Sequence, residues 1–196
     1  MTKTVEFFYD FGSPTVYLAA TQLPAVADQA GAIIDWRPML LGGVFKSTGN
    51  QSPVVVPAKA AYMNIDLERF AERYGVPFRF NPYFPINTLA LMRGAVAYQD
   101  DPAVSSTYRD AIFTAIWVEA QNLNEPDVVK QVLSDARLDP AELVSRIGQQ
   151  AVKDRLIANT EEAVNRGAFG APTFFVGEQM FFGQDRLDFV AEALSG

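Results

Sequence analysis

The sequence lacks two residue types that carry much of enzyme chemistry: none of its 196 residues is cysteine or histidine. Without cysteine the chain can form no disulfide, has no thiol nucleophile and cannot build an iron–sulfur or cysteine-ligated metal site. Without histidine it has no Ser-His-Asp or Cys-His catalytic pair and no ordinary general base near neutral pH. Its chemistry near pH 7 therefore depends on hydroxyls, carboxylates, lysine, backbone dipoles or a bound molecule, and we predict no metal site.

Positive charge is also scarce, since 16 Lys and Arg face 23 Asp and Glu and give a formal net charge of −7. The sequence has no basic run, so nucleic acid is not an expected partner. No apolar stretch approaches the roughly 20 residues of a membrane span, and the first residues lack the pattern of a signal peptide. We therefore expect a cytoplasmic protein with no membrane partner. An anionic substrate would need a local cation, because the overall field opposes it.

The N-terminal pattern predicts a β-α-β unit. Residues 5–9 are β-branched or aromatic and predict a buried strand, and residues 32–38 predict a second one. Between them residues 14–30 predict a helix, with Ser13 at its N-cap and Pro14 at its first position, where the missing N–H costs nothing. A right-handed crossover makes the two strands parallel.

The rest of the chain predicts a helical block followed by a β-β-α unit. Residues 40–57 are rich in Gly, Ser and Pro and predict a loop. The predicted helices cover residues 58–74, 87–98, 102–120, 126–135, 140–147 and 150–166; strands follow at 171–176 and 179–182, with a last helix at 187–194. The fold class is therefore thioredoxin-like α/β. The thioredoxin-like domain comprises residues 1–39 and 167–196, and residues 40–166 form a loop plus an inserted helical subdomain.

Several segments carry a resemblance to a known family. They are residues 8–14 (FYDFGSP), 40–50 (LLGGVFKSTGN), 169–174 (FGAPTF) and 181–187 (FFGQDRL). In this order and spacing the chain resembles the DsbA-like branch of the thioredoxin superfamily that includes 2-hydroxychromene-2-carboxylate isomerases and kappa-class glutathione transferases. The resemblance implies glutathione as cofactor, a small aromatic carboxylate as substrate and a homodimer.

Ser13 is the candidate catalytic residue. Redox members of the superfamily place Cys-x-x-Cys at the start of the first helix, where the dipole lowers a thiol pKa, but here residues 13–16 read SPTV. The resemblance implies that this position holds the thiolate of glutathione. Lowering a thiol pKa of ~8.5 by about two units requires about 2.7 kcal/mol. A hydroxyl hydrogen bond to a charged acceptor supplies roughly 1.5–3 kcal/mol and the helix N-terminus about 0.3–1 kcal/mol, so no histidine is required. The alternative is that Ser13 is an ordinary N-cap.

The remaining glutathione contacts are implied by the resemblance. Pro172 is expected to follow a cis peptide bond, which leaves the backbone of Ala171 free to pair with the cysteinyl unit of glutathione. The residues expected to bind the γ-glutamyl end are Phe182, Gly183, Gln184 and Asp185, with backbone N–H groups for its carboxylate and Asp185 for its ammonium group. The alternatives are a trans proline at a strand edge and a simple helix-capping run.

On the substrate side the resemblance implies roles for Lys46, as a cation near the sulfur, and for Phe84. A loop lysine can equally be a solvated surface charge. Further candidates, which the sequence alone does not assign, are Phe11, Phe45, Asn87, Arg93 and Trp117. Residues 54–57 are apolar where family isomerases carry polar substrate contacts, and Phe84 stands where they can have Tyr, so the natural substrate can differ.

The function predicted from this resemblance is glutathione-dependent isomerisation of 2-hydroxychromene-2-carboxylate to trans-o-hydroxybenzylidenepyruvate, a step of aromatic hydrocarbon degradation. The glutathione thiolate would add to the substrate, the ring would open and rotate, and elimination would release glutathione again. One alternative is a kappa-like transferase, which would consume glutathione. Another is a redox-inert module that binds extended peptides at the strand edge of Pro172.

Overall fold

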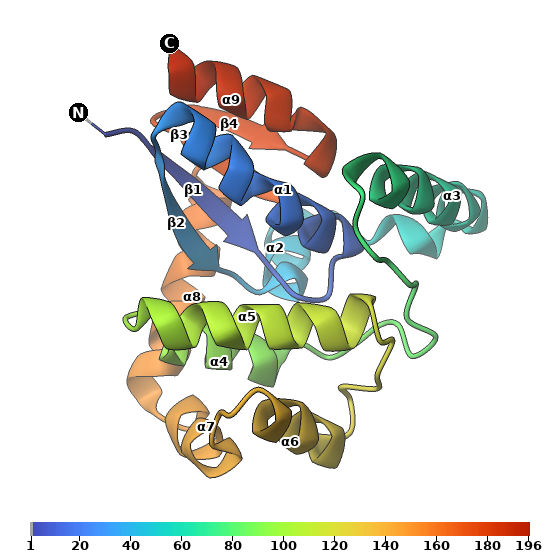
Figure 1. Ribbon diagram of the computed structural model, residues 1–196, viewed down its shortest axis with the longest axis vertical. Coiled ribbons are helices and arrows are strands. Elements are labelled where there is room, and N and C mark those ends of the chain that lie inside the picture. Colours follow the sequence, from blue (N-terminus) through green and yellow to red (C-terminus); the bar gives the residue numbers. More distant parts are fainter. Residues whose placement is uncertain (1) are drawn as a thin grey trace.

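The computed structural model describes residues 2–196, and its two chain ends contribute to one four-stranded sheet (Figure 1). The strands are β1 (Thr4–Tyr9), β2 (Ile33–Pro38), β3 (Thr173–Val176) and β4 (Gln179–Phe182), in the order β2-β1-β3-β4. β1 pairs parallel with β2 and antiparallel with β3, and β3 and β4 form a hairpin. This mixed sheet confirms the predicted α/β class. The domain boundaries at residues 39–40 and 166–167 stay a prediction.

Helices cover the sheet. α1 (Pro14–Ala30) begins at the predicted N-cap Ser13 and ends at Gly31, whose φ of 60° is the left-handed conformation that glycine adopts easily. α9 (Leu187–Ser195) lies beside α1 over the same face, and α8 (Gln150–Asn165) runs behind the sheet, where it packs on β2 (Figure 1). The carboxyl end of β1 therefore leads straight into the start of α1.

Five further helices come from the inserted segment. They are α3 (Pro57–Tyr74), α4 (Leu89–Ala97), α5 (Pro102–Trp117), α6 (Pro126–Asp135) and α7 (Pro140–Ile147). Four of them begin with proline, which is well suited to the first helical position. α5 ends at Trp117 rather than at the expected residue 120, and Ala120 has a φ of 54°, which an α-helix cannot contain. In Figure 1, α6 and α7 lie farthest from the sheet.

The prediction of a loop over residues 40–57 is wrong. Residues Leu41–Thr48 form α2, and Pro53–Val55 form a 3₁₀ turn, η1. The N–H of Leu41 donates to Asp10 Oδ2 at 2.8 Å, and the N–H of Leu40 donates to Thr160 Oγ1 at 3.0 Å. Distant side chains thus cap a helix whose own sequence, with Gly42 and Gly43, predicts none.

An aromatic core joins the sheet to the helical segment. The rings of Phe7 and Phe174 stack with centroids 4.9 Å apart. The indole N–H of Trp117, on α5, donates to the carbonyl of Phe11 at 2.8 Å. Phe11 and Trp117 are both 0% exposed, so these two substrate-side candidates belong to the core.

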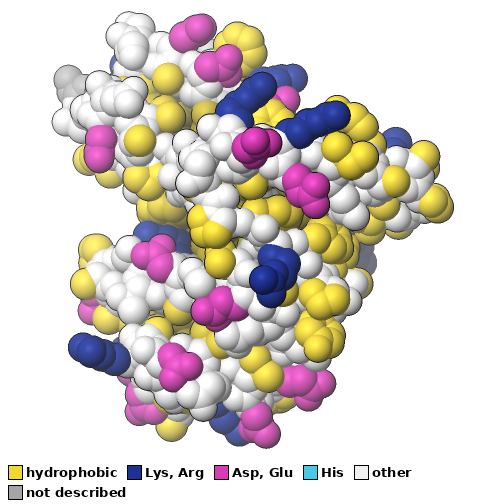
Figure 2. Space-filling view, turned by 45° about the vertical axis from the view of Figure 1, so that its right-hand side comes forward, with side chains coloured by type: hydrophobic (Ala, Val, Ile, Leu, Met, Phe, Trp, Pro, Cys, Tyr) yellow, Lys and Arg dark blue, Asp and Glu magenta, His cyan; other side chains and the backbone are white. Residues whose placement is uncertain are grey.

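The surface carries charges of both signs. On the face drawn in Figure 2, Lys and Arg side chains are interspersed with Asp and Glu side chains rather than gathered in one patch. Within residues 2–196, no helix combines the length and the hydrophobicity that crossing a bilayer requires.

Candidate functional site

Ser13 lies at the start of α1 with its hydroxyl in a polar cluster. Its side chain is 7% exposed, and its Oγ accepts the N–H of Val16 at 3.4 Å, as an N-cap does. The same Oγ lies 2.8 Å from Thr15 Oγ1 and 3.4 Å from the carbonyl oxygen of Ala171. Thr15 also donates to that carbonyl at 3.2 Å. Two hydroxyls at one helix N-terminus therefore face the start of β3.

The Ala171–Pro172 peptide bond is cis, as predicted. The bond places Ala171 opposite Ser13, and the carbonyl of Pro172 accepts the N–H of Gly183 at 3.1 Å. The segment before α9 is thereby fixed next to the start of α1.

These elements surround a cavity of about 400 Å³, here called the Ser13 cavity. It gathers most of the predicted site residues from four separate parts of the chain. Those that line it are Ser13, Phe45, Phe84, Ala171, Phe182, Gly183, Gln184 and Asp185. Its volume is in the range typical of small-molecule sites.

The structure does not place Lys46 in this cavity. Leu41 and Phe45, four residues apart on α2, line the Ser13 cavity, whereas Lys46 lines a different cavity together with Arg93. Successive helical residues point about 100° apart, and in α2 this separation directs Phe45 to one cavity and Lys46 to the other. The expected position of Lys46 near the sulfur is therefore wrong, because it assumed a loop.

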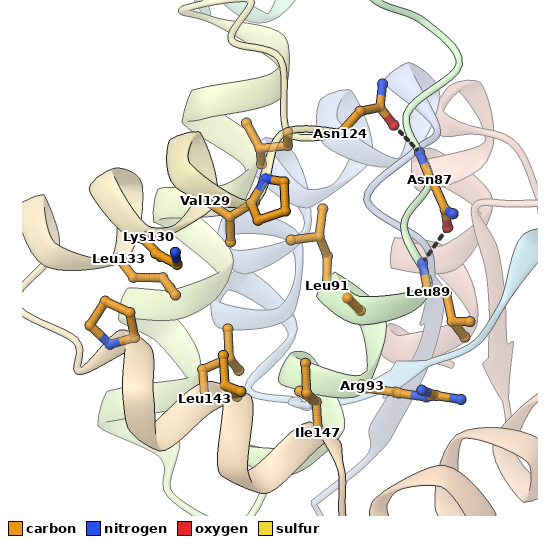
Figure 3. Close-up of a pocket in the computed structure, with 15 residues that line it drawn as sticks. Asn87, Leu89, Leu91, Arg93, Asn124, Val129, Lys130, Leu133, Leu143 and Ile147 are labelled. Atoms are coloured by element: carbon orange, nitrogen blue, oxygen red, sulfur yellow. Dashed lines mark hydrogen bonds between the residues drawn. The ribbon is translucent and has the colours of Figure 1, made fainter.

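Asn87 lies elsewhere too. It lines an apolar groove between α4, α6 and α7, where its side chain accepts the N–H of Leu89 (Figure 3). Neither Asn87 nor Arg93 is among the residues that line the Ser13 cavity.

The charges of the Ser13 cavity come from one turn. Gln184–Arg186 form a 3₁₀ turn, η2, directly before α9, which begins at Leu187 as predicted. Asp185 and Arg186 form an ion pair at 2.7 Å, and among the described lining residues they are the one acid and the one cation. Gly183 has a φ of 104°, and a Cβ there would lie 2.5 Å from Asp185 Oδ1, so only glycine fits without a shift.

Asp10 positions two backbone segments of the site through hydrogen bonds. Its carboxylate is 1% exposed and accepts the N–H groups of Gly12 at 2.9 Å and Leu41 at 2.8 Å. Burial raises the pKa of Asp10, and these two backbone hydrogen bonds oppose the rise. One side chain thus positions both the turn that ends at Ser13 and the start of α2.

Several lining residues were not predicted. Thr15 follows Ser13 by two residues, and this spacing at a helix start is the signal from which its hydroxyl beside that of Ser13 could be predicted. Phe80, Met63 and Asn64 also line the cavity, but they lie on segments whose sequences carry no local signal for it. Asn50 lines it as well and is the last residue of segment 40–50, which carries the family resemblance. Only the packing of the inserted segment brings them there.

Comparison with known proteins agrees with this geometry. The model of the DSBA-like thioredoxin domain matches residues 4–195. This chain belongs to the DsbA-like thioredoxin family. Within this family it is 33% identical to a 2-hydroxychromene-2-carboxylate isomerase of Sphingobium xenophagum, over 99% of each chain. It is 28% identical to the human glutathione S-transferase kappa 1, over 99% of this chain and 92% of that one.

A solved structure of a 2-hydroxychromene-2-carboxylate isomerase superposes on this DsbA-like protein with a TM-score of 0.87, at 28% identity, over 97% of this chain and 94% of that one. The predicted resemblance is therefore confirmed, and the chain belongs with the isomerases and kappa-class transferases of the family.

Proposed function

We propose that this protein is a glutathione-dependent isomerase of the 2-hydroxychromene-2-carboxylate type. The reaction of such an isomerase is a step in aromatic hydrocarbon breakdown. The observation that carries the proposal is the Ser13 hydroxyl at the N-terminus of α1, 3.4 Å from the carbonyl of Ala171 and open to a cavity, in a chain without cysteine or histidine. Bound glutathione would supply the nucleophilic thiolate that adds to the substrate and leaves again. The isomerase relatives support this substrate class.

The residues of the Ser13 cavity fit glutathione. A thiolate at the start of α1 would accept the Ser13 hydroxyl and lie at the positive end of the helix dipole. The backbone of Ala171 can pair with the cysteinyl unit, because Ala171 lines the cavity just before β3 begins and lies outside the paired residues of the sheet. Asp185 and Arg186 present both signs of charge, which complements the ammonium and carboxylate groups of the γ-glutamyl end. The first N–H groups of η2 supply further donors.

The other side of the cavity suits an aromatic body. Phe45, Phe80 and Phe84 line it, and the rings of Phe80 and Phe84 lie 5.5 Å apart. Aromatic rings pack favourably against such edges and faces.

A direct assay tests the proposal. Purified protein is mixed with 2-hydroxychromene-2-carboxylate, with and without glutathione, and the conversion to the benzylidenepyruvate is followed by absorbance. We expect conversion only with glutathione, with total glutathione unchanged. Absence of conversion, or conversion independent of glutathione, contradicts the proposal.

The second candidate is a kappa-like transferase, favoured by the similarity to the human kappa enzyme and by apolar lining residues such as Val54. Conjugation would consume glutathione in proportion to product, so the same assay separates the two functions. A homodimer, expected from the resemblance, stays a prediction that light scattering of the eluted protein tests.

A further inference from the structure

A second cavity lies on the opposite face of α2. It has a volume of about 390 Å³ and is lined by residues of α2, α4 and α8. Three of these residues are the cations Lys46, Arg93 and Lys153, and one, Glu161, is acidic. We call it the Lys46 cavity.

None of the three cations has a carboxylate partner within ion-pair distance in the described part of the chain. The Nε atom of Arg93 is buried without a hydrogen-bond partner in the same residues. Figure 3 shows that the Arg93 side chain leaves the apolar groove of α4, α6 and α7 on the side of Leu89, away from Leu133 and Leu143. Leu89 and Arg93 both line the Lys46 cavity.

The net charge of the chain is −7, so three cations and one acid in a single cavity form a local exception to its overall field. Six of the 16 Lys and Arg side chains form ion pairs in the described residues, and none of the three that share this cavity is among them. Three cations that line one cavity from separate helices repel one another, and an anion bound between them would relieve that repulsion.

The cavity walls define the rest of the ligand. Leu89, Leu156 and Ile157 line it, and Ile157 is 54% exposed. Apolar side chains beside cations favour an anion with a hydrocarbon body over inorganic phosphate, because the body removes apolar surface from water.

We propose that the Lys46 cavity is a second ligand site, separate from the Ser13 cavity, which binds a small dicarboxylate with an apolar body between Lys46, Arg93 and Lys153. Three cations against one carboxylate leave a local excess of two positive charges, which two carboxylates neutralise. The site does not require glutathione.

A fluorescence titration with 2,6-naphthalenedicarboxylate tests this site on the full chain without glutathione. We expect saturable binding that weakens about fivefold in Lys153→Ala and at least about thirtyfold in the double variant Lys46→Glu/Lys153→Glu. Lys59→Glu, at an exposed α3 lysine that lines neither cavity, carries the same charge change per site and should bind as wild type does. The monoacid 2-naphthoate should bind more weakly than the diacid, and inorganic phosphate should not displace the probe.

Three results overturn the proposal: no saturable binding to wild type, equal affinity in the double variant, which would place the probe in another cavity, or an equal loss in Lys59→Glu. A salt series on wild type gives a check that needs no variant. The Kd should rise steeply from about 50 to about 500 mM NaCl, and a constant Kd contradicts a site built from cations. Because glutathione is absent, failure here leaves the proposed isomerase activity untouched.

Discussion

The two faces of α2 line two cavities of similar size and opposite character. The Ser13 cavity is built from hydroxyls, backbone groups and aromatic rings, and its one described acid and one described cation are paired with each other. The Lys46 cavity holds three cations without ion-pair partners in the described chain. The first suits a ligand that brings its own charges of both signs and is polarised by a helix N-terminus, whereas the second suits a dianion.

Neighbouring residues of one short helix separate these environments. Phe45 faces the Ser13 cavity and Lys46 faces the other, because Asp10 and Thr160 fix the N-terminal end of α2. The helical geometry of α2, and not the residue type alone, therefore determines which side chain reaches the Ser13 cavity. Four substitutions in the Ser13 cavity test this contrast.

The largest effect is expected for Ser13→Ala. Losing a hydroxyl hydrogen bond to a charged sulfur removes about 1.5–3 kcal/mol, which lowers kcat for the isomerisation about 10- to 150-fold. Stopped assays of the benzylidenepyruvate product measure it, with Ser134→Ala on the exposed face of α6 as a matched control that keeps wild-type kcat. A kcat for Ser13→Ala within twofold of wild type would contradict a catalytic role for the Ser13 hydroxyl.

Gly183→Ala should weaken glutathione binding about tenfold. The added Cβ would displace Asp185, and the φ of 104° adds strain of about 1–3 kcal/mol. Gly177→Ala is the matched control, because Gly177 also has a positive φ, of 58°, but a Cβ there meets nothing within 4 Å. Calorimetric Kd values should change only in Gly183→Ala, while both variants lose thermal stability. Equal Kd values for glutathione in the two variants would show that the η2 turn does not contribute to glutathione binding.

Phe84→Ala tests whether the aromatic side of the Ser13 cavity binds the substrate and not glutathione. Losing part of an aromatic wall should raise the KM for the aromatic substrate about fivefold and leave the Kd for glutathione unchanged. Phe189→Ala, at a ring 48% exposed on α9, serves as control in steady-state assays. An unchanged KM in Phe84→Ala would show that the aromatic substrate does not pack against Phe84.

The smallest effect is expected for Thr15→Val. Its hydroxyl lies 2.8 Å from Ser13 Oγ and donates to Ala171, so its loss leaves Ser13 to donate to that carbonyl instead of the sulfur. We expect kcat to fall about threefold, and Thr15→Ser to restore it. A threefold loss that Thr15→Ser does not restore would indicate a packing role for the Thr15 methyl group.

Local signals predicted much of the fold and part of the site. Ser13 followed by Pro14 specifies a helix start by capping and by a fixed φ, and the structure begins α1 there. The hairpin around Gly177 follows from turn chemistry, and it is present. The cis bond before Pro172 came from the family resemblance, not from local physics, and it is also present.

Tertiary contacts account for what the sequence did not predict. α2 depends on Asp10 and Thr160, which are distant in the chain, and on Gly43, where a Cβ would lie only 3.1 Å from the Thr160 methyl group. Because the segment is a helix and not the predicted loop, Lys46 lines the Lys46 cavity and not the Ser13 cavity. The pairing of Arg186 with Asp185 likewise appears only once η2 is built.

The central claim is that Ser13 and the start of α1 hold glutathione as its thiolate, and an absorbance titration of the bound thiolate tests it most directly. In wild-type protein the bound thiol should titrate about two pH units below its free value of ~8.5, and Ser13→Ala should return most of that difference. A bound thiol that titrates at its free value in wild type, or identically in both proteins, contradicts the account.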